Sequence, residues 1–240
     1  DGNDGIVLKN ASSLADIKGR TVYLVELSVS HYLLARGLST VGLTMADVKT
    51  VNTSDADIVG AFANPSVTAA VTWNPQLTEL ATMPKAKLAF SSHQLPAEIL
   101  DLLAVDTATL KANPNLGKAL AGIWYETIGL MQQQNATGAA ARADMAKMAG
   151  STPEAFEAQL RTTHLYATPK DAVAAITSPT LANTMVKVRD FSFSKGLFGT
   201  GATSPDAIGI AMPGKTLGDP ANVKLRFDPS FMEQAAAGKL

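Results

Sequence analysis

Short apolar runs that alternate with helical patterns constrain this chain more than any other feature of its sequence. Between Ile6 and about Glu98, three such runs have the character of buried strands, and helical stretches separate them. These runs are Thr21–Val25, Val48–Val51 and Ala69–Trp73. Strands that alternate with helices build βαβ units, so the sequence predicts an α/β fold with a mainly parallel sheet.

Helical patterns dominate the second part of the chain. The run Leu100–Val105 predicts one more strand, which returns the chain to another lobe. Helix starts are then predicted where a capping residue precedes a proline, at Asn113-Pro114, Thr152-Pro153 and Thr168-Pro169. We therefore expect two domains, with residues 1–98 forming an α/β lobe that carries ligand-side loops. Residues 99–240 would supply the return strand, the C-terminal helices and a tail, most of which belong to the other lobe.

Composition excludes several classes of function. Hydrophobic residues make up 46% of the 240 and charged residues 17%, which is typical of a globular chain with a large core. The formal net charge is -1 and the basic residues are scattered, so we expect no nucleic-acid partner. The chain has no cysteine, which removes disulfides and thiolate nucleophiles, and its three histidines lie far apart, so we expect no metal and no cofactor.

The polar loop after the first predicted strand is the most informative candidate site. Glu26, Ser28 and Ser30 follow a buried strand, and one of the two serines is expected to cap a helix that continues through His31 and Tyr32. Ligands of open α/β sheets bind at this edge. Helix amides there favour an anion, whereas Glu26 favours a cationic or hydrogen-bond-donating solute. Alternatively, Glu26 is a solvated loop residue or pairs with a lysine.

Two further segments contribute candidate residues. Trp73 and Asn74 end another predicted strand, and the indole either forms a cleft wall that stacks on a planar or cationic solute or seals the core. His93 either lines the cleft or lies at a hinge between the lobes. The eight candidate ligand-binding residues are Glu26, Ser28, Ser30, His31, Tyr32, Trp73, Asn74 and His93.

Several of these segments resemble periplasmic solute-binding proteins of the nitrate, taurine and alkanesulfonate type. The resemblance covers nearly the whole chain and is carried by Leu14–Arg20, Ser30–Leu34, Ala69–Pro75, Pro96–Asp101 and Trp124–Glu126. Within that superfamily, the chain looks most like the branch associated with urea carboxylase pathways. The segments that carry this finer resemblance are Val25–Tyr32, Val71–Pro75 and Ala221–Phe227.

The resemblance implies a type II periplasmic-binding fold with two lobes and an interlobe cleft, and a solute-binding role in an ABC importer. It implies guanidinium or a urea-like compound as the ligand, a membrane permease as the partner and no catalysis. We expect a monomer located in the periplasm or otherwise outside the cytoplasm, either free or lipid-anchored. Family members begin with a further segment that supplies part of the first lobe, so the resemblance also implies an N-terminal segment missing from this chain.

Three alternatives stay open at this point. The chain could bind nitrate, taurine or an alkanesulfonate instead. It could be an enzyme similar to thiamine-pyrimidine synthases, although those relatives look cysteine-bearing and histidine-dependent, and this chain has no cysteine. It could also be the effector-sensing domain of a transcription regulator, although no helix-turn-helix precedes the lobe in this sequence.

Overall fold

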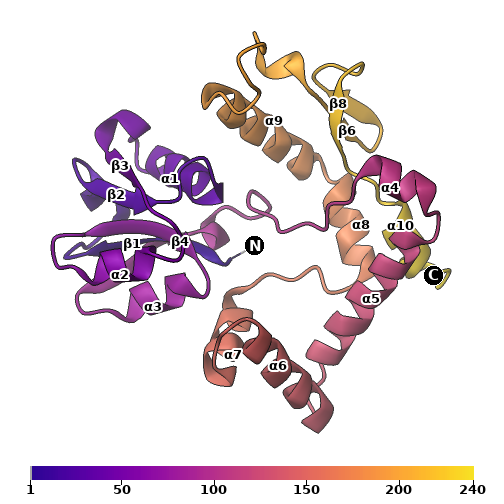
Figure 1. Ribbon diagram of the computed structural model, residues 1–240, viewed down its shortest axis with the longest axis horizontal. Coiled ribbons are helices and arrows are strands. Elements are labelled where there is room, and N and C mark those ends of the chain that lie inside the picture. The colour runs from indigo at the N-terminus through magenta and orange to yellow at the C-terminus, as the bar shows by residue number, and fades with distance from the viewer. Residues whose placement is uncertain (1) are drawn as a thin grey trace. The chain divides into compact units, whose positions relative to one another are not determined.

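The computed structural model describes residues 2–240 and divides the chain into two compact units (Figure 1). Unit 1 comprises the residues up to Ile99 together with Ser151–His164. Unit 2 comprises Leu100–Gly150 and Leu165–Leu240. The boundary expected after residue 98 and the assignment of each part to a lobe stay predictions.

Unit 1 is built on a five-stranded sheet with the strand order β3-β2-β4-β1-β5. The strands are β1 (Asp4–Lys9), β2 (Thr21–Leu24), β3 (Lys49–Asn52), β4 (Ala69–Trp73) and β5 (Ala86–Ser91). β2 pairs in parallel with β3 and β4, whereas β1 runs antiparallel to both β4 and β5. The predicted α/β class with a mainly parallel sheet is confirmed.

Helices cover both faces of this sheet. α1 (Val29–Thr40) packs on one face, and α2 (Ile58–Ala63) and α3 (Gln76–Thr82) pack on the other (Figure 1). All six residues of β1 are buried, as is usual for a strand that is covered on both faces. The core under α2 and α3 consists of Val7, Ile58, Phe62, Val67, Ala70, Leu77 and Leu80.

A buried lysine closes the edge of the sheet at which β1 ends. The ammonium of Lys9 donates hydrogen bonds to the carbonyls of Phe62 and of Asn64, the latter at 3.0 Å, and lies 4.4 Å from the centroid of the Phe62 ring. These carbonyls belong to the C-terminus of α2, where the helix dipole favours a cation. Burial lowers the pKa of the Lys9 ammonium from its usual value.

The opposite edge of the sheet gathers the polar loops. Because β2, β3, β4 and β5 run in the same direction, all four reach their carboxyl ends at this edge, and β1 begins there. We call this edge the carboxyl edge.

One further helix of unit 1, α7 (Pro153–Thr162), begins where the sequence predicts it, and Thr152 Oγ1 caps it by accepting a hydrogen bond from the amide of Ala155.

Unit 2 is mostly helical and carries a small sheet. Its helices are α4 (Thr107–Ala112), α5 (Leu116–Met131), α6 (Ala136–Met148), α8 (Pro169–Thr177), α9 (Pro179–Ser194) and α10 (Ser230–Ala236). Its strands are β6 (Gly209–Met212), β7 (Lys215–Leu217) and β8 (Val223–Arg226), in the order β7-β6-β8. Leu181, Ala182 and Met185 of α9 pack against Ile210 and Met212 of β6 and form its core.

Of the two helix starts predicted in unit 2, the one at Asn113-Pro114 is wrong, because Asn113 is the C-cap of α4 and α5 begins at Leu116. The start at Thr168-Pro169 is confirmed, and capping chemistry explains it. Thr168 Oγ1 accepts a hydrogen bond from the amide of Asp171, and Pro169 occupies the first position of α8, as the sequence predicts. α9 ends at Ser194, and Gly196 follows it with a φ of 73°, a left-handed conformation that glycine adopts without strain.

The strand predicted at Leu100–Val105 is wrong. This segment is irregular, and Leu102 and Leu103 are exposed. A run that is apolar at nearly every position has no alternation, so it cannot distinguish a buried strand from an extended connection.

Within residues 2–240, no helix has the length and apolar character needed to cross a membrane.

Candidate functional site

The carboxyl edge of unit 1 brings together the segments that contain the candidate residues. Glu26 to Tyr32 follow β2, Trp73 and Asn74 end and follow β4, and His93 follows β5. The parallel order of the strands produces this arrangement, because each loop leaves the sheet on the same side. The role of these residues in binding a ligand stays a prediction.

Neighbouring β3 positions Glu26 on this edge. Thr50 Oγ1 donates a hydrogen bond of 2.5 Å to Glu26 Oε1, and the amide of Glu26 donates one of 2.9 Å to Asn52 Oδ1. The side chain is half-buried, so it is neither a freely solvated loop residue nor part of the core. A carboxylate held in this way presents a fixed negative charge at the edge.

The start of α1 lies directly after Glu26 in the chain. Ser28 is the N-cap, because its Oγ accepts a hydrogen bond from the amide of Ser30 at 3.1 Å and donates one to the carbonyl of Val25 at 2.7 Å. Both hydrogen-bonding functions of this hydroxyl therefore serve the turn. Ser30, by contrast, is fully buried, and among residues 2–240 its hydroxyl has no hydrogen-bond partner.

His31 is buried beside this cap. Its Nδ1 accepts a hydrogen bond of 3.1 Å from the amide of Leu27, a residue with a φ of 62°. In a neutral imidazole with Nδ1 as acceptor, the proton resides on Nε2. The ring therefore fixes the left-handed turn that leads from Glu26 into α1.

Trp73 and Asn74 differ in how the protein uses them. Trp73 is half-buried at the last position of β4. Asn74 Nδ2 donates to Asn3 Oδ1 at 3.1 Å, and Asn74 Oδ1 accepts from Thr78 Oγ1 at 2.7 Å. The amide of Asn74 thus fastens its loop to the start of β1, whereas the indole is the group of this pair that is suited to contact a solute.

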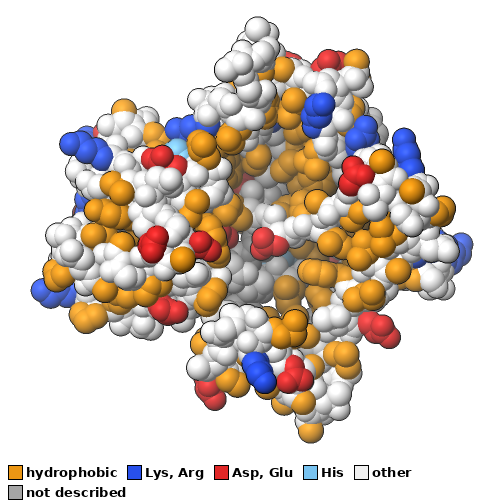
Figure 2. Space-filling model, in the orientation of Figure 1, with side chains coloured by type: hydrophobic (Ala, Val, Ile, Leu, Met, Phe, Trp, Pro, Cys, Tyr) orange, Lys and Arg blue, Asp and Glu red, His pale blue; other side chains and the backbone are white. Residues whose placement is uncertain are grey.

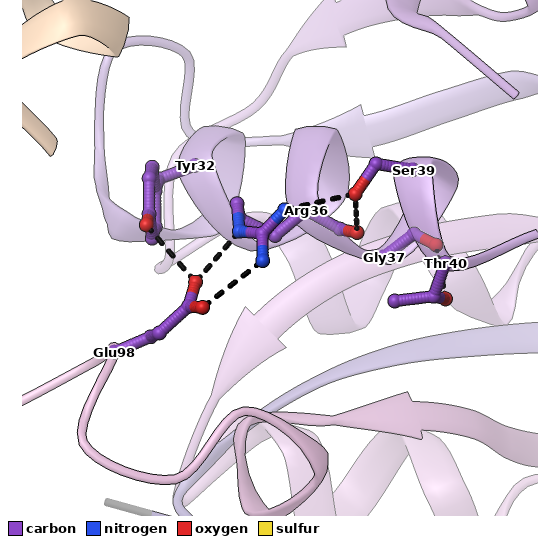
Figure 3. A network of polar contacts seen from close by, with 6 residues as sticks. All are labelled: Tyr32, Arg36, Gly37, Ser39, Thr40 and Glu98. Atoms are coloured by element: carbon purple, nitrogen blue, oxygen red, sulfur yellow. Dashed lines mark hydrogen bonds and ion pairs between the residues drawn. The ribbon is translucent and has the colours of Figure 1, made fainter. Parts of the chain in front are cut away.

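Tyr32 contributes to a separate polar network with Arg36 and Glu98 (Figure 3). The guanidinium of Arg36 donates to both carboxylate oxygens of Glu98, at 2.6 and 3.0 Å, and the hydroxyl of Tyr32 donates to the same carboxylate at 3.1 Å. Burial and then the negative charge of Glu98 raise the pKa of Tyr32, and the hydrogen bond to Glu98 raises the pKa of Arg36. This network ties α1 to the segment that leaves unit 1 after β5.

The segment after β5 provides one exposed and one buried side chain. His93 is exposed in a short 3₁₀ turn, Ser92–Gln94. Ser92 is buried, and its Oγ accepts hydrogen bonds from the amides of Gly2 and Asp4, at 2.9 and 3.2 Å. Ser92 therefore fixes the start of β1 at the carboxyl edge.

Sequence reasoning missed four residues at this edge, namely Asp4, Thr50, Asn52 and Ser92. Thr50 and Asn52 belong to β3, and pairing of β3 with β2 brings them to Glu26. The parallel sheet itself was predicted, so a search for polar side chains at the end of each strand would have found Asn52. Asp4 and Ser92 depend on the antiparallel insertion of β1, which no local pattern indicates.

Comparison with protein families gives one match. Residues 6–134 match the family described as NMT1/THI5 like. This match covers β2 to β5 and the greater part of β1, and it extends through α5. A search of curated protein sequences finds no match.

Solved structures show the same fold. The putative sulfonate ABC transporter periplasmic sulfonate-binding protein SsuA from Methylobacillus flagellatus KT matches with a TM-score of 0.68 at 15% identity, over 98% of this chain and 66% of that chain. The alkanesulfonate-binding protein SsuA from Xanthomonas axonopodis pv. citri, bound to MOPS, matches with a TM-score of 0.61 at 21% identity, over 83% and 66%. The periplasmic aliphatic sulphonate binding protein SsuA from Escherichia coli matches with a TM-score of 0.61 at 19% identity, over 82% and 61%.

These likenesses confirm the expected periplasmic-binding-protein type of α/β fold. This chain spans 61 to 66% of the length of the three solved chains.

Proposed function

Because the chain belongs to the NMT1/THI5-like family, we propose that it is the solute-binding component of an ABC importer and binds a small guanidinium or urea-like solute. The carboxyl edge of unit 1 is the binding surface. The protein releases the solute unchanged to a membrane permease, and it works outside the cytoplasm as a monomer. The similar solved structures support the transport part of this proposal, since all three are described as sulfonate-binding proteins and two of them as periplasmic.

One observation carries the ligand class, namely the side chains that the carboxyl edge contains. The segments at this edge, residues 25–32, 52–57, 73–76 and 91–95, include no lysine and no arginine. They do include Glu26, which Thr50 fixes in a half-buried position, and the indole of Trp73. A fixed carboxylate pairs with a planar, forked cation through two parallel hydrogen bonds, and an aromatic face attracts the same cation.

A calorimetric panel tests this proposal. The solutes are guanidinium, urea, taurine, nitrate and a short alkanesulfonate. We expect guanidinium to bind with a dissociation constant near the micromolar range, about -8 kcal/mol, and the other solutes more weakly. A protein that binds none of the five solutes would contradict the proposed function.

A neutral isostere of the carboxylate sharpens this test. Glu26→Gln should weaken guanidinium binding by roughly tenfold or more, because it removes the charge-assisted hydrogen bonds. Glu79→Gln is the matched control, since Glu79 is exposed on α3, and it should bind like the unchanged protein. Equal affinities of the two variants would reject Glu26 as the partner of the cation.

Alkanesulfonate binding is the second candidate function. The three similar solved proteins favour it, since each is described as sulfonate-binding. The start of α1 at the carboxyl edge also favours it, because helix amides attract anions. The same calorimetric panel separates the candidates. Tight binding of a sulfonate without a response to guanidinium would select this function over the first.

The absence of turnover is part of the proposal, because the family name also covers THI5-like proteins. Incubation of the protein with each solute, followed by mass spectrometry, should recover the solute unchanged. Conversion of any of them would establish an enzyme.

A further inference from the structure

We infer that Asp4 is a second recognition carboxylate and that Asp4, Trp73 and Ser30 form one subsite for the N–H groups of a flat cation. This inference rests on the proposed function, because it identifies residues and ligand chemistry within the same binding surface. Asp4 lies at the first position of β1, and none of the sequence patterns above indicates it.

Strand register places Asp4 beside Trp73. In the antiparallel pair of β1 and β4, Asp4 is directly opposite Trp73, and Ile6 is directly opposite Val71. Residues that are directly opposite in such a pair project to the same face of the sheet, with Cβ atoms about 4.5–5.5 Å apart. The carboxylate of Asp4 and the indole of Trp73 therefore leave the sheet side by side.

The face in question is the one that α1 covers. A Cβ built on Gly37 of α1 would lie 2.9 Å from Ile6 Cδ1, so this part of the helix packs directly on Ile6. Ile6 and Asp4 are two residues apart on one strand and hence share a face. Asp4 and Trp73 thus occupy the end of the α1 face at the carboxyl edge.

The first turn of α1 points a hydroxyl toward this end of the face. Ser30 and Gly37 are seven residues apart, which is two helical turns, so Ser30 also faces the sheet. Because α1 begins at the carboxyl edge, Ser30 lies about 10.5 Å nearer to that edge than Gly37. Ser30 is 0% exposed, and its Oγ has no hydrogen-bond partner among the described residues.

An unsatisfied buried hydroxyl is rare in a native interior, because it loses its hydrogen bonds to water without replacement. A bound solute at the end of the α1 face would satisfy it. The hydroxyl can accept an N–H from the solute, and the carboxylate of Asp4, which belongs to a residue only 5% exposed, can accept another. The adjacent indole offers the flat surface on which a planar cation stacks.

The backbone holds Asp4 firmly in this position. Its amide donates to the buried Oγ of Ser92, and β1 pairs on both sides with β4 and β5. A carboxylate with this support cannot swing away from a bound anion at low cost. Asp4 therefore favours a donor-rich cation and disfavours a sulfonate.

Calorimetry with guanidinium chloride tests this subsite. Asp4→Asn should weaken binding by roughly tenfold or more, because the neutral amide keeps the shape and loses the charge. The matched control is Asp144→Asn, which makes the same change of charge at an exposed position on α6 of unit 2, and it should stay within about twofold of the unchanged protein. Equal affinities of Asp4→Asn and Asp144→Asn would overturn the inference.

Ser30→Ala provides an independent variant if Asp4→Asn does not fold. The hydroxyl makes no hydrogen bond within the described chain, so its removal should leave the fold intact. Guanidinium binding should weaken by about threefold or more, because one hydrogen bond to the solute is lost. Unchanged affinity of Ser30→Ala would remove Ser30 from the subsite and would overturn the three-residue arrangement.

The two proposals fail in different ways. A protein that binds guanidinium while Asp4→Asn and Ser30→Ala bind it equally well would contradict only this inference. A protein that binds none of the five solutes in the panel would contradict the proposed function itself.

Discussion

Unit 1 and unit 2 bury their apolar side chains to very different extents. In unit 1, the sheet and its covering helices enclose Leu24, Leu34 and Phe62 completely. In unit 2, the large side chains of α5 stay open, since Ile123 is 61% exposed and Trp124 is 48% exposed. Figure 2 shows apolar side chains gathered on the surface of the helices of this unit.

This difference shows what a central sheet contributes. A sheet offers two faces, and helices cover both faces of the sheet in unit 1, so the apolar side chains between the sheet and these helices are buried. α5, by contrast, packs mainly against two other helices, α6 and α10. We therefore expect the side chains of unit 1 to dominate the free energy of unfolding.

The largest expected effect is Phe62→Ala in unit 1. Removal of a fully buried ring leaves a cavity and should lower the free energy of unfolding by about 3–5 kcal/mol. Urea unfolding monitored by circular dichroism measures the change. A loss below about 1 kcal/mol would show that the core of unit 1 is no tighter than that of unit 2.

The polar network on α1 comes next. Arg36→Met leaves the carboxylate of Glu98 without its cation in a half-buried site and should cost about 2–3 kcal/mol. Glu98→Gln should cost less, and the double variant should cost less than the sum of the two. A double-mutant cycle by urea unfolding measures this coupling. If the losses in free energy of unfolding of the two single variants add up to the loss of the double variant, Arg36 and Glu98 have no coupling energy.

Gly117→Ala probes how closely unit 2 is packed. A Cβ at Gly117 would lie 2.2 Å from the ring of Phe231, so α5 and α10 must separate or the ring must turn. Overpacking of this kind costs about 1–3 kcal/mol, and the better helix propensity of alanine returns up to about 1 kcal/mol. We expect a net loss of about 1 kcal/mol, and a gain in stability would show that α10 is loosely held.

The pH dependence of unit 1 should show a smaller effect above pH 10. The pKa of Tyr32 is raised in the folded chain, so the unfolded chain loses this proton first as the pH rises. The contribution of Tyr32 is therefore complete below its unfolded pKa near 10 and is lost at higher pH. Urea unfolding of the native protein and of Tyr32→Phe from pH 9 to 11 measures this contribution as the difference between their free energies of unfolding. A difference that stays constant over this pH range would contradict the prediction.

The smallest effect is expected for Trp124→Ala in unit 2. The indole is half-exposed, so its removal should change the free energy of unfolding by no more than about 0.5 kcal/mol. Urea unfolding measures it on the same scale as Phe62→Ala. A loss comparable with that of Phe62→Ala would erase the contrast between the units.

The sequence was sufficient to predict much of the fold, where local chemistry determines it. β2, β3 and β4 lie within a residue of the predicted runs, and the prolines that follow Thr152 and Thr168 mark helix starts. β1 and β5 were missed as strands. β1 is buried throughout and inserted antiparallel between two strands that are distant in sequence, which is a property of the whole sheet and not of the segment.

The candidate site was predictable only in part, for a related reason. The loops after β2 and β4 could be located because parallel strands place their carboxyl ends at one edge. The partners that fix or accompany those loops could not be located, since Thr50 reaches Glu26 and Asp4 reaches Trp73 through strand register. Ser28, Tyr32 and Asn74 are engaged by neighbouring groups of the protein, which residue type alone does not reveal.

The buried ammonium of Lys9 has a practical consequence. Amine-reactive reagents modify lysines that solvent reaches, and the carbonyls and aromatic ring around Lys9 exclude such reagents from the native chain. The rate at which such a reagent modifies Lys9 would thus report how often unit 1 opens around this side chain.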